Sequence, residues 1–384
     1  MIFDPPADLE LELSAIEQID DLRRQLRHRV AEPRRWLGGL RRLTFARAVQ
    51  GSNSIEGYNA SVDDVMAVVA DEEALGTTTG TRLALQGYRD AMTYVVALAD
   101  DGDLDVDESL LRSLHYMMIK HDLAMRPGRW RHGDVFVRRE PLGDIVYEGP
   151  DADLVPELVH ELLARVNEHD GSVLVRAAMA HLNLVMVHPF KDGNGRMGRC
   201  LQTLVLARER IVAPVFSSIE EQLGRDTEAY YAVLGSVGGG SWHPTNDARP
   251  WVRFYINAHY AQARRALRRT RDIEELWGRC EEIVARYGLP DRAIGALCDA
   301  SRGLRIQNWY YRVTVRESEG SEIDTTTAGR DLRAMVDRGL LLARGETRGR
   351  FYIGTPELQG AYASVRTGSP SGDRADLFED RGSI

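Results

Sequence analysis

The helical spacing of apolar residues is the feature that most constrains the fold of this 384-residue chain. Apolar residues recur every three or four positions from about Leu9 to Leu123, for example between Val62 and Val69, which predicts helices with one buried face. The pattern resumes at Val155 and runs to Val187. We expect that helix to end at His188, because the residue before a proline disfavours the α region.

Composition narrows the class of protein. The chain is 43% hydrophobic and 28% charged, as in ordinary globular proteins, and no apolar run is long enough to cross a bilayer. Its N-terminus lacks the basic start and apolar stretch of a secretion signal, and its three cysteines are widely spaced. These features predict a cytoplasmic protein without a membrane partner. The formal charge of −9 argues against polyanion binding by the molecule as a whole.

Changes in residue pattern and composition divide the chain into segments. Short alternating pieces between glycines and prolines predict a hairpin over residues 128–148, inside a helical region that we divide into residues 1–100 and 101–265. Residues 272–357 show the order helix, strand, turn, strand, which is typical of a winged helix. The tail, 366–384, is rich in Gly, Ser and Asp and is predicted to be disordered. The predicted fold is therefore mainly α, with a small C-terminal α+β unit.

Residues 188–199, with the sequence HPFKDGNGRMGR, carry the most chemistry. Gly193 and Gly195 flank Asn194 where a loop becomes a helix. Backbone at such a point can approach a ligand closely, and its free N–H groups can point at an anion. The segment therefore predicts a phosphate site.

The charged residues of this stretch extend that prediction. Arg196 and Arg199 lie on one face of the expected helix, where both guanidinium groups can pair with phosphate oxygens. Asp192 offers an oxygen ligand that suits Mg²⁺ between two phosphates, and His188 can take a proton near neutral pH. A nucleotide polyphosphate is the expected ligand. Taken singly, these residues also fit a helix C-cap, an Asx turn and two surface arginines.

The stretch matches at every fixed position the signature of the Fic family, His-Pro-Phe-x-Asp-Gly-Asn-Gly-Arg-x-x-Arg, and the resemblance extends over about residues 45–263. It implies a helical Fic domain in which the hairpin at 128–148 is a flap that holds a target segment as an added strand. It also implies transfer of AMP from ATP to a Ser, Thr or Tyr hydroxyl of a target protein or of the chain itself, with release of pyrophosphate.

The resemblance assigns roles to individual residues. His188 would be the catalytic base, and Asp192 would hold Mg²⁺. Tyr230 and Tyr231, which the resemblance assigns to ATP binding, fit a buried core position equally well. The residues that would bind ATP are Gly193, Asn194, Gly195, Arg196, Met197, Gly198, Arg199, Tyr230 and Tyr231.

Ser52–Gly57 resembles the inhibitory motif of Fic proteins that carry their own N-terminal restraint. A Glu56 carboxylate facing Arg199 would occupy the guanidinium that the γ-phosphate of ATP needs. Glu56 is therefore the expected inhibitory residue. The alternative is an ordinary exposed glutamate at a helix end.

In the C-terminal unit, Thr325–Arg333 is a candidate recognition helix, followed by a wing with Arg344, Arg348 and Arg350. Such a module would bind DNA through these arginines, or would form a partner or homodimer surface. A competing function follows: a DNA-binding regulator whose Fic domain only senses nucleotide.

Overall fold

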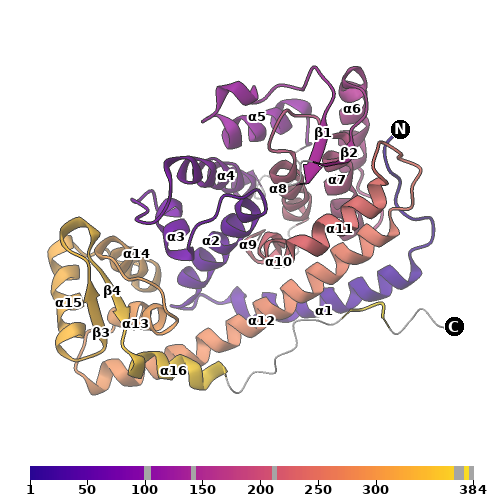
Figure 1. The fold of residues 1–384 in the computed structure, drawn as a ribbon. Helices are drawn as coiled ribbons and strands as arrows, with labels where there is room; N and C mark the ends of the chain where they lie inside the picture. The colour runs from indigo at the N-terminus through magenta and orange to yellow at the C-terminus, as the bar shows by residue number, and fades with distance from the viewer. Residues whose placement is uncertain (99–104, 140–143, 210–213, 367–375, 380–384) are drawn as a thin grey trace.

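The computed structural model describes residues 1–98, 105–139, 144–209, 214–366 and 376–379. Within them the chain is mainly helical, with two short hairpins (Figure 1). The helices are α1 (Glu10–Ala31), α2 (Leu37–Ile55), α3 (Val62–Val69), α4 (Thr79–Leu98), α5 (Glu108–Ile119), α6 (Val155–Val166), α7 (Val173–Val187), α8 (Asn194–Arg208), α9 (Pro214–Ser217), α10 (Glu220–Arg225), α11 (Thr227–Gly238), α12 (Arg249–Arg286), α13 (Ala293–Ser301), α14 (Asn308–Glu319), α15 (Thr325–Asp337) and α16 (Pro356–Arg366). The strands are β1 (Phe136–Arg139), β2 (Asp144–Glu148), β3 (Leu341–Arg344) and β4 (Phe351–Gly354).

Helices α7 and α8 form the centre of the larger part of the molecule (Figure 1). Both are buried on nearly every side, as expected for helices that other helices surround. The Trp251 indole on α12 donates a hydrogen bond of 2.7 Å to the backbone oxygen of Ala178 and fastens α12 to α7. This packing fixes the loop between α7 and α8.

Helix α12 is 38 residues long and lies along α1 (Figure 1). The boundary predicted between residues 265 and 272 falls inside this continuous helix. Its sequence contains no proline after Pro250 and only the single glycine Gly278, so nothing interrupts the backbone hydrogen bonds. The C-terminal unit therefore follows α12 without a linker at that boundary.

The predicted hairpin is present. β1 and β2 pair antiparallel, with Phe136 opposite Glu148 and an irregularity after Val137, while residues 140–143 lie outside the described residues. The Glu148 amide also donates a hydrogen bond of 3.0 Å to the Gly240 carbonyl. Gly240 thus lies beside β2.

The C-terminal unit consists of α13, α14 and α15, followed by the β3–β4 hairpin, so the predicted order of elements is present. Its assignment as a winged helix, with α15 as recognition helix, stays a prediction. The unit packs against α2, where the buried Arg42 pairs with Glu317 and donates a hydrogen bond of 3.0 Å to Thr314.

The chain continues beyond residue 357 as α16. Of the predicted disordered tail, residues 367–375 and 380–384 lie outside the described residues. The piece between them contacts α12, because Asp376 accepts a hydrogen bond of 2.8 Å from Asn257. Among the described helices, none combines the length and apolarity that crossing a membrane requires.

Candidate active site

The loop between α7 and α8 begins and ends on two residues in the left-handed region. His188 ends α7 with φ of 51° and ψ of 58°, and Gly193 precedes α8 with φ of 80°. A Cβ on Gly193 would lie 2.9 Å from Cδ1 at the flexible end of Ile119, so it is the left-handed backbone conformation that favours glycine there. The predicted helix end at Val187 and helix start at Asn194 are therefore both present.

Asn194 closes the loop on itself. Its side chain accepts a hydrogen bond from the Phe190 amide and donates one to the Phe190 carbonyl, each 2.9 Å long. The side chain is buried, and both its oxygen and its nitrogen take part in these contacts. The backbone N–H of Asn194 lies at the N-terminus of α8, where it can contribute to an anion site.

His115 on α5 supports the loop and was not found from the sequence. Its ring stacks on Phe190 at 3.7 Å, its Nδ1 accepts from the Gly128 amide at 2.8 Å, and its Nε2 lies 2.9 Å from the Asp192 carbonyl. Because an amide only donates and a carbonyl only accepts, Nε2 carries the proton. Burial lowers the pKa of His115 to about 4, so the ring stays neutral and holds the loop against α5.

His188 is arranged as a base. Its Nδ1 lies 3.1 Å from the Val185 carbonyl, which can only accept, so Nδ1 carries the proton and Nε2 keeps its lone pair. Burial lowers the pKa of His188 to about 4, and the charge of Arg131 acts in the same direction. The imidazole is therefore neutral and able to take a proton throughout the physiological range.

Arg196 and Arg199 bring two buried charges to the first turns of α8, where the exposed fractions of their side chains are 1% and 0%. Nε and Nη1 of Arg196, and Nη1 of Arg199, have no acceptor within the part of the chain that the structure describes. Burying an N–H of a charged group without an acceptor is unfavourable by roughly 1–3 kcal/mol or more. These donors point to an anionic ligand at this position.

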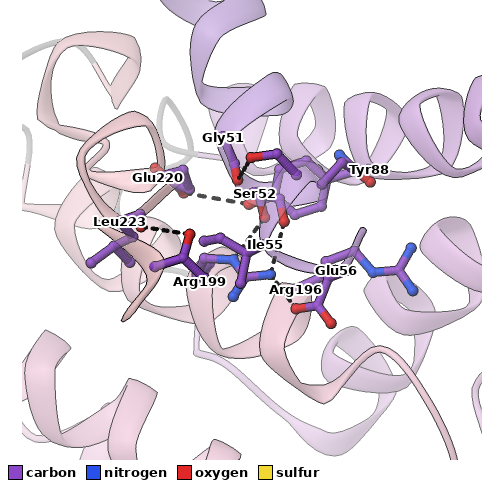
Figure 2. A network of polar contacts seen from close by, with 12 residues as sticks. Gly51, Ser52, Ile55, Glu56, Tyr88, Arg196, Arg199, Glu220 and Leu223 are labelled. Carbon is purple, nitrogen blue, oxygen red and sulfur yellow. Dashed lines mark hydrogen bonds and ion pairs between the residues drawn. The ribbon is translucent and has the colours of Figure 1, made fainter. Parts of the chain in front are cut away.

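The Glu56 carboxylate lies beside Arg199, where that anionic ligand is expected. It follows the last residue of α2, and its Oε1 is 2.6 Å from Nη2 of Arg199, whose Nε and Nη2 also donate to Oγ and the carbonyl of Ser52 at 2.8 and 3.0 Å (Figure 2). A Cβ on Gly195 would overlap the Glu56 carboxylate. Burial alone lowers the pKa of Arg199, but the Glu56 carboxylate and nearby tyrosines outweigh that effect, so the guanidinium stays charged.

Asp192 pairs with Arg196. Its side chain is 45% exposed, and Oδ2 lies 3.2 Å from Nη2 of Arg196. The ring of Tyr58 covers the other side of Arg196 at 5.2 Å. The loop thus presents one half-exposed carboxylate beside two arginines.

Four other predicted ATP-binding residues differ in their surroundings, and of these Tyr230 has its ring 6.0 Å from the Arg199 guanidinium. The Met197 side chain is fully buried, and Gly198 packs against α7. Tyr230 is buried with its hydroxyl 2.9 Å from Nε2 of His181, whereas Tyr231 is 47% exposed and donates a 3.3 Å hydrogen bond to the Ile55 carbonyl. Tyr230 thus has the core position that the sequence left open, while Tyr231 lies at the edge of the site.

A polar network lies behind Arg199 and was also missed from the sequence (Figure 2). Glu220 is buried and accepts hydrogen bonds of 2.8 Å and 3.4 Å from Thr203 and Tyr88. Burial raises the pKa of Glu220 to about 7, while the charge of Arg199 favours the ionised form of Glu220 and acts to lower that pKa. Its partners are separated by up to 132 positions in sequence, so no local spacing identifies them.

Comparison with known proteins gives a family match for the part of the chain that contains this site. Residues 105–206 match the model of the Fic/DOC family. A protein adenylyltransferase Fic of Nematostella vectensis is 26% identical over 216 residues, which cover 53% of this chain and 44% of that protein. The fic-1 adenylyltransferase of Caenorhabditis elegans is 27% identical over 258 residues, covering 64% and 45%. The chain thus spans less than half the length of these curated relatives.

Solved structures agree at the level of the fold. A Fic family protein from Desulfovibrio desulfuricans superposes with a TM-score of 0.57 at 23% identity, covering 92% of this chain and 99% of that one. A Fic-domain signalling protein from Bacteroides thetaiotaomicron gives 0.53 at 18% identity, covering 66% and 96%. With the His188–Arg199 loop placed as described, the chain contains a Fic domain over residues 105–206.

Proposed function

We propose that the protein transfers AMP from ATP to a hydroxyl group of a protein. One observation carries the proposal: three guanidinium nitrogens of Arg196 and Arg199 are buried without acceptors among the described residues, beside a helix N-terminus and a neutral histidine. Polyphosphate oxygens would satisfy these donors, and His188 supplies the base that transfer requires. The names of the curated relatives support the same activity.

The phosphates of ATP would bind at the start of α8. The N–H groups of Asn194 and Gly195 belong to its free first turn, and the positive end of the helix dipole favours an anion there. Arg199, released from Glu56, would hold the γ-phosphate. Arg196 would hold phosphate oxygens nearer the reacting phosphorus.

A magnesium ion fits this arrangement only together with the nucleotide. No group of three His, Cys, Asp or Glu side chains in the described residues could hold a metal by itself, but Asp192 offers one half-exposed carboxylate. Mg²⁺ commonly takes one or two carboxylates plus substrate phosphates. When bound, the ion would supply positive charge to the phosphates, and Asp192 would be its ligand in the protein.

His188 would perform the proton transfer. Its Nε2 takes the proton from a Ser, Thr or Tyr hydroxyl while that oxygen attacks the α-phosphorus. The bond from the α-phosphorus to the bridging oxygen breaks, and pyrophosphate leaves with the electron pair. Because Nδ1 stays bound to the Val185 carbonyl, Nε2 faces the reaction in the correct tautomer.

We further propose that Glu56 inhibits this reaction. Its carboxylate pairs with Arg199 and sits directly over Gly195, so it occupies both the cation and the backbone position that a γ-phosphate needs. Ser52 keeps Arg199 in place whether or not Glu56 is there. The inhibited protein therefore has an assembled site that nucleotide enters only after the carboxylate leaves.

The flap would present the target. Phe136 and Ile145 on the hairpin are 41% and 52% exposed, which gives an added strand apolar side chains to contact. Main-chain pairing of this kind accepts varied sequences. DNA binding through the C-terminal unit, a homodimer and a cytoplasmic location remain proposals that rest on the sequence.

Incubation with α-labelled and γ-labelled ATP tests the function. We expect label on protein from α-labelled ATP alone, in a Glu56→Gly variant that removes the proposed inhibition. In His188→Ala the rate of labelling should fall by about 10²–10⁴-fold. ATP binding should be retained. His160→Ala, on an exposed position of α6, is the control. ATP binding without transfer by the Glu56→Gly variant would favour the nucleotide-sensing alternative.

A further inference from the structure

Arg131, in the part of the flap that precedes β1, is buried among backbone carbonyls, with 6% of its surface exposed. Its Nε donates to the carbonyl of His188 at 2.9 Å, and its Nη1 donates to that of Gly133 at 2.7 Å. Nη2 donates to the Pro150 carbonyl and lies 3.5 Å from that of Val187. One planar guanidinium thus binds carbonyls from three separate segments.

These contacts hold a strained residue. His188 is one of only four non-glycine residues with positive φ in the described chain, a conformation that costs roughly 1–3 kcal/mol and persists only where neighbours enforce it. The Arg131 amide also donates to the Pro189 carbonyl at 2.9 Å. Arg131 therefore fixes the backbone on both sides of the His188–Pro189 bond and neutralises the negative end of α7.

The same side chain joins both ends of the flap. Gly133 precedes β1 and Pro150 follows β2, and between them the Gly149 amide donates to the Val135 carbonyl at 3.1 Å. Since the guanidinium also holds His188, its planar fork sets the base of the hairpin at a fixed position relative to the imidazole.

We propose that Arg131 is a positioning residue that aligns the flap, and any hydroxyl presented on it, with Nε2 of His188. This inference rests on the proposed transfer reaction. No spacing in the sequence marks Arg131, which is 57 positions from His188. The charged groups that act on His188 are Arg131, Glu56 and Asp192, and of these Arg131 alone disfavours a protonated ring.

The test compares Arg131→Gln and Arg131→Lys in the Glu56→Gly background, with the exposed Arg129→Gln as matched control. Self-modification under saturating α-labelled ATP gives the rate, and calorimetry gives the Kd for ATP. We expect ATP affinity within twofold of the parent. The rate should fall about 10²-fold in Arg131→Gln, as for a misplaced reacting group. It should fall at least tenfold in Arg131→Lys, because one ammonium cannot bind both flap ends and His188.

Titration of the His188 ring by NMR separates positioning from general loss of structure. The midpoint should rise in Arg131→Gln, which lacks the cation, and stay near the parent value in Arg131→Lys. Rates and midpoints equal to those of Arg129→Gln overturn the proposal, as does a rate loss that only follows the loss of ATP binding. If Arg131→Gln does not fold, an unchanged rate in Arg131→Lys overturns it. Absence of transfer in the parent would refute the reaction, while the NMR midpoint would still report on Arg131.

Discussion

Replacing Glu56 with glycine tests the proposed inhibition most directly. The change removes the carboxylate that lies 2.6 Å from Nη2 of Arg199, while both contacts from Ser52 keep the guanidinium where it is. The buried cation then loses its only carboxylate partner in the described structure. We therefore expect the variant to be less stable than wild type without nucleotide, and to be stabilised more strongly by ATP.

The size of the effect follows from the contact that is lost. A hydrogen bond to a charged group contributes about 1.5–3 kcal/mol, and ATP binding to the wild type must break this contact. Since 1.4 kcal/mol corresponds to a factor of ten, the Kd for ATP should fall by about 10- to 100-fold in Glu56→Gly. The gain should vanish in the double variant Glu56→Gly with Arg199→Ala, because the two residues share one interaction.

Calorimetry with ATP gives these affinities, and α-labelled ATP gives the accompanying rates. Glu56→Gln is the informative control, since it keeps the volume of the side chain but removes its charge, and should lie between wild type and Glu56→Gly. Equal Kd values for wild type and Glu56→Gly would refute the reasoning. So would a gain that persists when Arg199 is alanine.

Three further predictions concern pH and stability. Because the pKa of His188 is lowered to about 4, transfer by Glu56→Gly at saturating ATP should stay constant between about pH 8 and 5; a fall already near pH 6.5 would contradict this. Burial raises the pKa of Glu220 from 4.5 to about 7, so the stability that its protonated form supports is full below pH 4.5 and lost as pH rises through 7. Urea titrations across this pH range should show a loss of about 3 kcal/mol in the wild type and none in Glu220→Gln. Identical pH profiles for the two proteins would contradict the prediction. Arg42→Ala should lower the free energy of unfolding by about 3–5 kcal/mol because it leaves the Glu317 carboxylate without its buried partner; a loss under about 1 kcal/mol would mean that solvent replaces the pair.

Local sequence signals predicted the elements around the site. The proline after His188 and the glycines beside Asn194 placed the end of α7 and the start of α8 correctly, because these residues restrict the backbone on their own. The hairpin was predicted for the same reason. The boundary predicted near residue 265 falls inside α12, since a change in composition does not end a helix when no residue breaks its hydrogen bonds, and the division into domains stays a prediction.

The supporting contacts could not be predicted in this way. His115 reaches the Asp192 carbonyl across 77 positions, and Arg131 reaches that of His188 across 57. Each uses a backbone carbonyl as its partner, and every residue has one, so the sequence carries no sign of the pairing. Asn194 shows the converse: its place in the motif was clear, but its side chain serves the loop rather than a ligand.

The proposed inhibition and the proposed activity depend on the same small set of atoms. Gly195 has no Cβ, and the space that a Cβ would fill is occupied by the Glu56 carboxylate. The phosphate that we place there would use the same gap and the same guanidinium of Arg199. A phosphate placed there would meet the Glu56 carboxylate, and the two negative charges would repel each other. The proposed inhibition by Glu56 would therefore act by competition with nucleotide for Arg199 and for the space over Gly195, without any change in the geometry of His188.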